Sequence, residues 1–152
     1  MINIDHSGHV SIRNCIFVCF TGNQKGNVIS ASKSELNAKA GGDSTIEHTY
    51  ENLYFSDPNN GYPISDGEAT DVIIRNVTVQ YTDSSKSAGG FNIANFRILA
   101  ISDCHFTNTK SSTGTVLLNP LSENSILVNI EKCTFTECND RGILIKLPQN
   151  SN

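Results

Sequence analysis

The sequence contains no tryptophan and one methionine, and only 17% of its residues are charged. Its Lys and Arg residues are scattered, so it lacks the basic patch that marks a nucleic-acid-binding protein. No apolar run approaches the roughly 18 residues that a membrane-spanning helix needs. Residues 1–6 also lack the basic region and apolar stretch that open a secretory signal peptide. We therefore expect no nucleic-acid partner, no membrane-spanning segment and no signal peptide in this chain.

Cysteine is sparse as well, with five residues in the chain of 152. A disulfide framework usually has an even number of cysteines, packed into a shorter chain. A structural zinc site is disfavoured too, because the sequence has no Cys-x-x-Cys pair. The sequence therefore predicts no metal site and no cofactor.

Asn, Ser, Thr and Gly dominate the polar residues, and these favour turns and short strands over helices. Hydrophobic residues account for 38% of the chain, and 152 residues are enough to bury the core of one domain. No shift in composition divides the chain, so we expect a single domain over residues 1–152. A polar stretch at about 32–44, which includes Gly41 and Gly42, is expected to form an outward loop.

An eight-residue pattern recurs along the chain. The segments 10–17, 72–79, 99–106 and 128–135 each read apolar, any, Ile, polar, turn-prone polar, Cys or Val, any, Phe or Val. A weaker copy at 48–55 puts a histidine, His48, at an inward position. The fifth residue of each copy is expected to anchor a bend between two strands, because Asn and Asp tolerate unusual backbone angles. The anchors are Asn14, Asn52, Asn76, Asp103 and Lys132, spaced by 38, 24, 27 and 29 residues.

A second element follows each anchor and consists of a Gly followed by an apolar alternation. Its copies begin at Gly26, Gly61, Gly90, Gly114 and Gly142. Alternation with a period of two predicts short strands, and three short strands per repeat describe one coil of a solenoid. The sequence thus predicts an all-β parallel β-helix of about five coils. Its core is expected to stack the repeat-position side chains Cys15, Cys104, Cys133, Phe17, Phe55, Phe106 and Phe135.

Three copies of the repeat contain Cys-x-Phe, at 15–17, 104–106 and 133–135, and the segment 89–93 reads Gly-Gly-Phe-Asn-Ile. This combination resembles the pectin-lyase-like superfamily of parallel β-helices and, more narrowly, the repeats of polymorphic outer-membrane proteins. The other Gly elements have a single Gly. The resemblance covers nearly the whole chain. It implies a right-handed coil and an adhesin-like protein that is extracellular or at the cell surface.

Enzymes of this superfamily carry acidic residues on neighbouring coils. Resemblance to its glycoside hydrolases implies a cluster of Asp residues that act as acid and base. The Asp-Asp, Asn-Thr-Asp and Arg-Ile-Lys motifs of those enzymes are absent from this sequence. The stretch nearest to Arg-Ile-Lys, residues 97–99, lacks the Lys. Its calcium-dependent lyases imply Asp and Glu residues together with an Arg base. The candidate acids for that role are Asp66, Glu68, Asp71 and Asp103, of which the first three form the densest patch, and Arg75 and Arg97 are the basic partners.

The missing catalytic motifs favour a non-catalytic module that binds a glycan or a cell-surface protein. A polysaccharide lyase or glycoside hydrolase is one alternative, and a structural spacer is another. The residues expected to contact a ligand are Asp66, Glu68, Asp71, Arg75, Tyr54 and Tyr81.

The ends of the repeat carry a further expectation. The first predicted strand begins within about ten residues of Met1, and the last ends at Leu147. Solenoids normally cover their terminal coils with polar or helical caps. We therefore expect a fragment with open ends.

Overall fold

A computed structural model describes residues 2–5, 8–18, 27–32, 45–58, 61–82, 88–120, 126–138 and 141–147. These residues form strands and no helix, and none of them belongs to a helix that could cross a membrane. The polar loop expected at 32–44 lies outside them from residue 33 onward. The strands are β1 (Ile2–Asp5), β2 (Val10–Val18), β3 (Ile29–Ser32), β4 (Glu47–Ser56), β5 (Ile64–Asp66), β6 (Asp71–Gln80), β7 (Phe91–Ala94), β8 (Ile98–Ser102), β9 (His105–Thr107), β10 (Val116–Asn119), β11 (Leu127–Glu131), β12 (Thr134–Thr136) and β13 (Ile143–Ile145).

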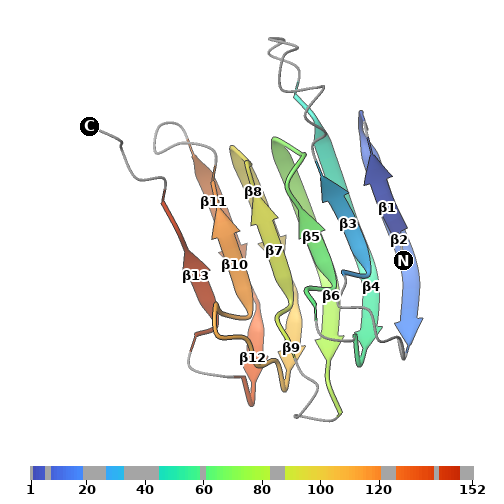
Figure 1. Cartoon of the computed structure of the whole chain (residues 1–152), viewed down its shortest axis with the longest axis vertical. Helices are drawn as coiled ribbons and strands as arrows, with labels where there is room; N and C mark the ends of the chain where they lie inside the picture. Colours follow the sequence, from blue (N-terminus) through green and yellow to red (C-terminus); the bar gives the residue numbers. More distant parts are fainter. Residues whose placement is uncertain are drawn as a thin grey trace.

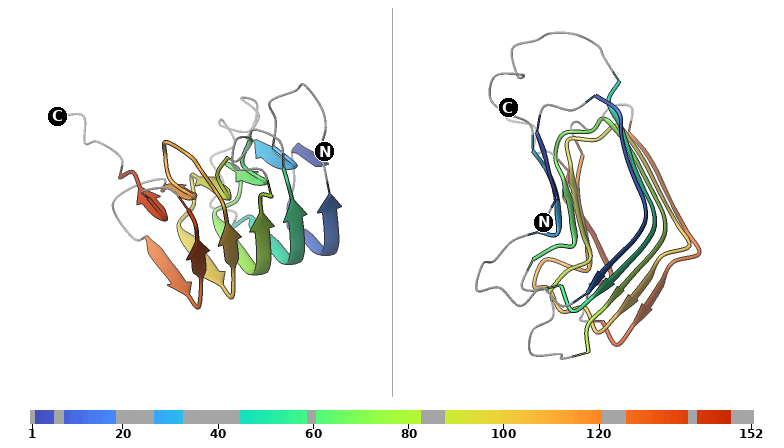
Figure 2. Two further views of the ribbon diagram at one scale, coloured as in Figure 1. Left: turned by 90° about the horizontal axis from the view of Figure 1, so that it is seen from below. Right: turned by 90° about the vertical axis from the view of Figure 1, so that its right-hand side faces the viewer.

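The strands stack in two parallel sheets (Figure 1). A six-stranded sheet has the order β1-β3-β5-β7-β10-β13, and a seven-stranded sheet has the order β11-β8-β6-β4-β2, with β9 and β12 alongside. Viewed along the stack, the successive coils superpose as one outline (Figure 2). Buried apolar side chains from both sheets form one core. The prediction of an all-β parallel solenoid is therefore confirmed.

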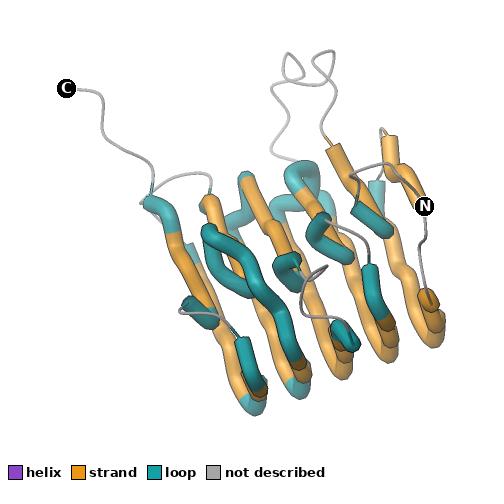
Figure 3. The backbone as a smooth tube through the Cα atoms, turned by 60° about the horizontal axis from the view of Figure 1, so that its bottom comes forward, coloured by secondary structure: helices purple, strands orange, loops and turns teal. Residues whose placement is uncertain are grey.

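The seven-stranded sheet is divided into five rungs, which we number from the N-terminus. The first three are β2, β4 and β6, the fourth is β8 with β9, and the fifth is β11 with β12. About four turns of the solenoid join these five rungs, and the strands of the tube drawing form the same regular stack (Figure 3). The repeat in the sequence therefore corresponds to rungs placed one on another.

Each rung bends at its anchor residue. The five anchors, Asn14, Asn52, Asn76, Asp103 and Lys132, have φ between 49° and 56°, in the left-handed region. The first three are also joined by hydrogen bonds. The Asn52 side-chain amide donates to Asn14 Oδ1 at 2.9 Å, and the Asn76 amide donates to Asn52 Oδ1 at 2.8 Å. The asparagines therefore shape the bend and also link neighbouring rungs.

A second bend was not predicted from the sequence. Asp57, Asn108 and Glu137 each lie five residues after an anchor and have φ of 50°, 56° and 53°. Each follows the last residue of a strand, so the chain turns out of the seven-stranded sheet at that point. Tyr81 takes the same place in the third rung and is not among the residues with positive φ.

The core consists of inward side chains stacked from rung to rung. Phe17 stacks on Phe55 with ring centroids 4.9 Å apart, and Phe106 stacks on Phe135 at 5.0 Å. Cys104 is buried, whereas Cys15 and Cys133 are half-buried on the first and last rungs. The inward side chains of the central rungs are therefore the least exposed to solvent, and their burial supplies most of the hydrophobic stabilisation.

Candidate functional site

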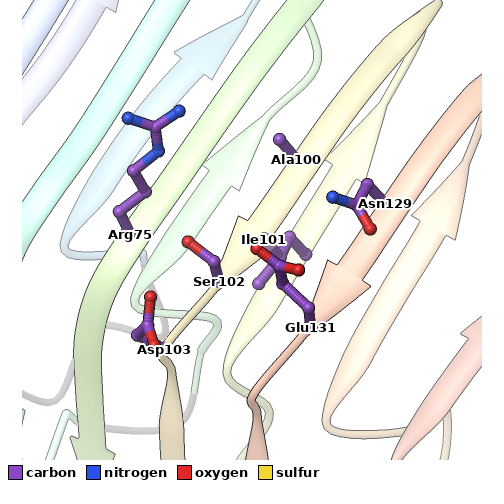
Figure 4. Close-up of a pocket in the computed structure, with 7 residues that line it drawn as sticks. All are labelled: Arg75, Ala100, Ile101, Ser102, Asp103, Asn129 and Glu131. Atoms are coloured by element: carbon purple, nitrogen blue, oxygen red, sulfur yellow. The ribbon is translucent and has the colours of Figure 1, made fainter.

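The outward face of the seven-stranded sheet carries its side chains in columns that run along the stack. One column contains Ile73, Ala100 and Asn129, on the third, fourth and fifth rungs. The fourth rung contributes only Ala100 to this column and Ser102 to the next column. Its outward side chains are therefore shorter than those of the rungs on either side. A hollow of about 310 Å³ results, which we call the groove. The groove is lined by Arg75, Ala100, Ile101, Ser102, Asp103, Asn129 and Glu131 (Figure 4).

Charged side chains stand on opposite walls of the groove. In register, Arg75 pairs with Ser102, and Ser102 pairs with Glu131, so the two charged residues flank the serine from either side. Asp103, the anchor of the fourth rung, adds a second carboxylate at one end (Figure 4). The groove therefore presents one cation and two anions around a floor of small residues.

The charges of the groove have no ion-pair partners in the described part of the chain. Arg13 and Glu51 occupy the same column two rungs and one rung before Arg75, and they pair with each other at 3.3 Å. Glu51 is thus paired with Arg13, on the side away from Arg75. Among the described residues, neither Arg75 nor Glu131 forms an ion pair. The groove can therefore offer both signs of charge to a ligand.

The residues expected to form an acidic patch do not gather on one face. Asp66 and Glu68 are buried, with 1% and 5% of their surface exposed. Asp71 lies at the start of β6, where its carboxylate Oδ1 is 3.9 Å from the guanidinium of Arg97. Arg75 and the fourth candidate acid, Asp103, line the groove. The five residues Asp66, Glu68, Asp71, Arg75 and Arg97 therefore do not converge on one face, as a calcium-dependent lyase built from them would need.

The two tyrosines expected to contact a ligand make internal contacts. Tyr81 is buried, and its hydroxyl donates to the carbonyl of Gly89 at 3.1 Å. Burial also raises the pKa of Tyr81. Tyr54 is half-buried, and its hydroxyl donates to Gln80 Oε1 at 3.0 Å. Neither side chain lines the groove.

A buried polar cluster occupies the interior of the second coil. Asp66 Oδ2 accepts hydrogen bonds from His48 Nδ1 at 2.7 Å and from the Tyr50 hydroxyl at 2.8 Å. Asp66 Oδ1 accepts from the backbone N–H groups of Glu68 at 3.0 Å and Ala69 at 3.2 Å. Because every polar group here has a partner, the cluster can replace apolar side chains inside the solenoid.

Hydrogen bonding decides the charge state of the cluster. Burial alone would raise the pKa of Asp66, but the hydrogen bond and charge of His48, then the Glu68 N–H and the Tyr50 hydroxyl, lower it below its usual value. An ionised carboxylate only accepts hydrogen bonds, so His48 Nδ1 must carry the proton. Burial and the nearby Asp66 raise the pKa of Tyr50, which keeps its hydroxyl a donor.

From the sequence we expected Arg75 to contact a ligand and Asp103 to be an anchor and a candidate acid, and both residues line the groove. Ser102, Asn129 and Glu131 were not singled out. A signal was present, because the fourth copy of the repeat has small residues, Ala100 and Ser102, at both of these outward positions. The repeat alone did not show that Arg75 and Glu131 would lie on either side of Ser102.

The groove offers polar and charged groups to a ligand. Its lining includes a hydroxyl, an amide and three charged groups. Among the described residues, no group of three His, Cys, Asp or Glu side chains could hold a metal ion. No protein-family model, curated protein or solved structure gives a significant match to this chain.

Proposed function

We propose that this chain is a non-catalytic binding module of a secreted or surface-exposed adhesin-like protein, and that its partner binds in the groove. The observation that carries the proposal is the gap left by Ala100 and Ser102 between Arg75 and Glu131. These side chains project from paired strands of a stacked sheet, which holds them more rigidly than a loop would. A preformed site of this kind loses little entropy when a partner binds.

A protein partner is favoured over a glycan. The lining of the groove contains no aromatic side chain on which a sugar ring could pack. Its oppositely charged walls instead suit a polypeptide surface, on which acidic and basic side chains occur side by side. We therefore expect a protein partner, and the test below also measures glycan binding.

The two alternative functions are less well supported. The predicted lyase site included Asp66, but that carboxylate accepts four hydrogen bonds inside the solenoid. A structural spacer would need no cluster of unpaired charge on its outer face. The groove argues against the spacer because unpaired charges of both signs stand around one hollow.

The test is a binding screen of the purified protein on glycan and peptide arrays, with and without calcium, run beside a lyase assay on acidic polysaccharides. The key variant is Arg75→Ala, and the matched control is Arg13→Ala, which occupies the same column two rungs away. We expect Arg75→Ala to weaken binding by about tenfold or more and Arg13→Ala to leave it unchanged. Turnover of a polysaccharide would overturn the non-catalytic proposal, and the absence of any binding would leave the spacer.

A further inference from the structure

We infer that the groove selects a peptide segment that carries an acidic and a basic side chain about 10 Å apart. The inference rests on the proposed function, because it names the class of partner for the same groove. Arg75 would pair with the acidic side chain, and Glu131 together with Asp103 would pair with the basic one.

The distance follows from the stacking of the rungs. Arg75 lies on the third rung and Glu131 on the fifth, with Ser102 between them in register. Neighbouring strands of a sheet are about 4.8 Å apart, so two steps place the backbones of the charged residues about 10 Å apart. A peptide in the polyproline II conformation rises about 3.1 Å per residue with three residues per turn, so side chains three positions apart project from the same side about 9 Å apart. A segment with an acidic residue and a basic residue three positions apart therefore fits along the stack.

The charge pattern argues for both signs in one ligand. A purely anionic ligand would meet Arg75 but would also face the carboxylates of Asp103 and Glu131. A purely cationic ligand would meet those carboxylates and be repelled by the guanidinium. Like charges brought together at an interface disfavour the wrong partner, so the groove discriminates against either single sign. A segment with both signs leaves Arg75 and Glu131 paired.

The polar floor of the groove fits a polypeptide backbone. Ser102 offers a hydroxyl, and Asn129 offers both a carbonyl oxygen and an amide. Backbone N–H and C=O groups that become buried on binding need such partners. The small side chains of Ala100 and Ser102 leave room for the peptide to approach the sheet.

The test uses short blocked peptides with Asp and Lys three positions apart, and their binding is followed by fluorescence anisotropy or by NMR shifts of the intact chain. Two control peptides replace Asp by Asn or Lys by Gln, so that each keeps one charge. We expect the peptide with both charges to bind about tenfold more tightly than either control. Equal binding of all three would overturn the inference.

Charge exchange supplies the second arm of the test. Arg75→Glu and Glu131→Lys should each weaken binding of the doubly charged peptide. The double variant exchanges the two charges, so it should bind the peptide more tightly than either single variant does, with the peptide running in the opposite direction along the groove. If Arg75→Glu abolishes binding while Glu131→Lys has no effect, the groove reads an anion alone and the inference is wrong. Thermal melts of the variants show whether they are folded, and both side chains are exposed.

The two proposals can fail separately. Loss of glycan or protein binding in Arg75→Ala, without any preference for the doubly charged peptide, would leave the binding module standing and remove this partner. Failure of every array and every peptide to bind would remove both proposals.

Discussion

His48 Nδ1 lies 2.7 Å from Asp66 Oδ2, although His48 belongs to the seven-stranded sheet and Asp66 to the six-stranded one. Both side chains are fully excluded from solvent. In register, His48 stands where Val10 and Val72 stand on the neighbouring rungs. Each polar residue is thus tolerated inside the solenoid because the other satisfies it, and the pair ties the two sheets together across the core.

Removal of the carboxylate should destabilise the protein strongly. Asp66→Ala would leave His48 Nδ1, the Tyr50 hydroxyl and two backbone N–H groups without their acceptor. We expect a loss of about 3–5 kcal/mol in the free energy of unfolding, and a smaller loss of about 1.5–3 kcal/mol for Tyr50→Phe. Urea unfolding measures both. Ser65→Ala, the outward neighbour on β5, is the control, and equal stability of Asp66→Ala and this control would contradict the role of the cluster.

The same cluster should make the free energy of unfolding depend on pH in the acidic range. The pKa of Asp66 is lowered in the folded protein, so its stabilising contribution is complete above the ordinary carboxyl pKa of about 3.9 and is lost as the pH falls through the lower folded value. In Asp66→Asn this group no longer titrates. The difference in unfolding free energy between the natural chain and Asp66→Asn should therefore shrink between about pH 5 and pH 2. A difference that stays constant over this range would show that the folded pKa is not lowered.

Cys104 should resist alkylation in the folded protein. Burial raises the pKa of its thiol to about 12, so almost none of it is the reactive thiolate near pH 8. We expect iodoacetamide to label Cys104 far more slowly in the native chain than in guanidinium chloride, as followed by peptide mass spectrometry. Cys133 is half-buried on the last rung and provides a comparison within the same column. Native labelling of Cys104 at the denatured rate would show that the central rungs open readily.

Two glycines offer a matched pair of substitutions. A Cβ at position 90 would lie 2.4 Å from Phe106 Cε1, and Phe106 is held between Phe91 and Phe135. Gly90→Ala should therefore cost about 1–3 kcal/mol of stability. A Cβ at Gly67 would meet its nearest atom at 3.8 Å, an ordinary contact, so Gly67→Ala should be nearly neutral. Differential scanning fluorimetry of the two variants tests this, and equal melting temperatures would mean that the ring of Phe106 can move aside.

Local patterns in the sequence were enough to predict the strands and the anchored bends. Period-2 alternation places every second side chain on one face whatever lies around it, and Asn or Asp is suited to positive φ by its own chemistry. The bend at Lys132 shows the limit of that argument. Its φ is 52° although lysine has no such preference, so the repeat rather than the residue type imposes the conformation.

Contacts between coils were beyond reach of the sequence pattern. His48 looked like an exception to an apolar position and Asp66 was expected to contact a ligand, and only their approach across the core explains why both are buried. Similarly, Tyr54 and Tyr81 were expected to contact a ligand, but they and Tyr50 make internal hydrogen bonds. Their hydroxyls donate to Asp66, Gln80 and Gly89, which are 8 to 26 residues away in the chain.

The sequence by itself determined the all-β repeat, its anchors and its inward apolar positions, because each of these depends on residues that are close along the chain. Tertiary structure decided which charges are paired. Arg13 pairs with Glu51 at 3.3 Å, whereas Arg75, in the same column, faces Ser102 on its next rung. The physical reason is that the stacking of coils makes neighbours of residues 24 to 38 positions apart, and a local pattern in the sequence does not contain those contacts.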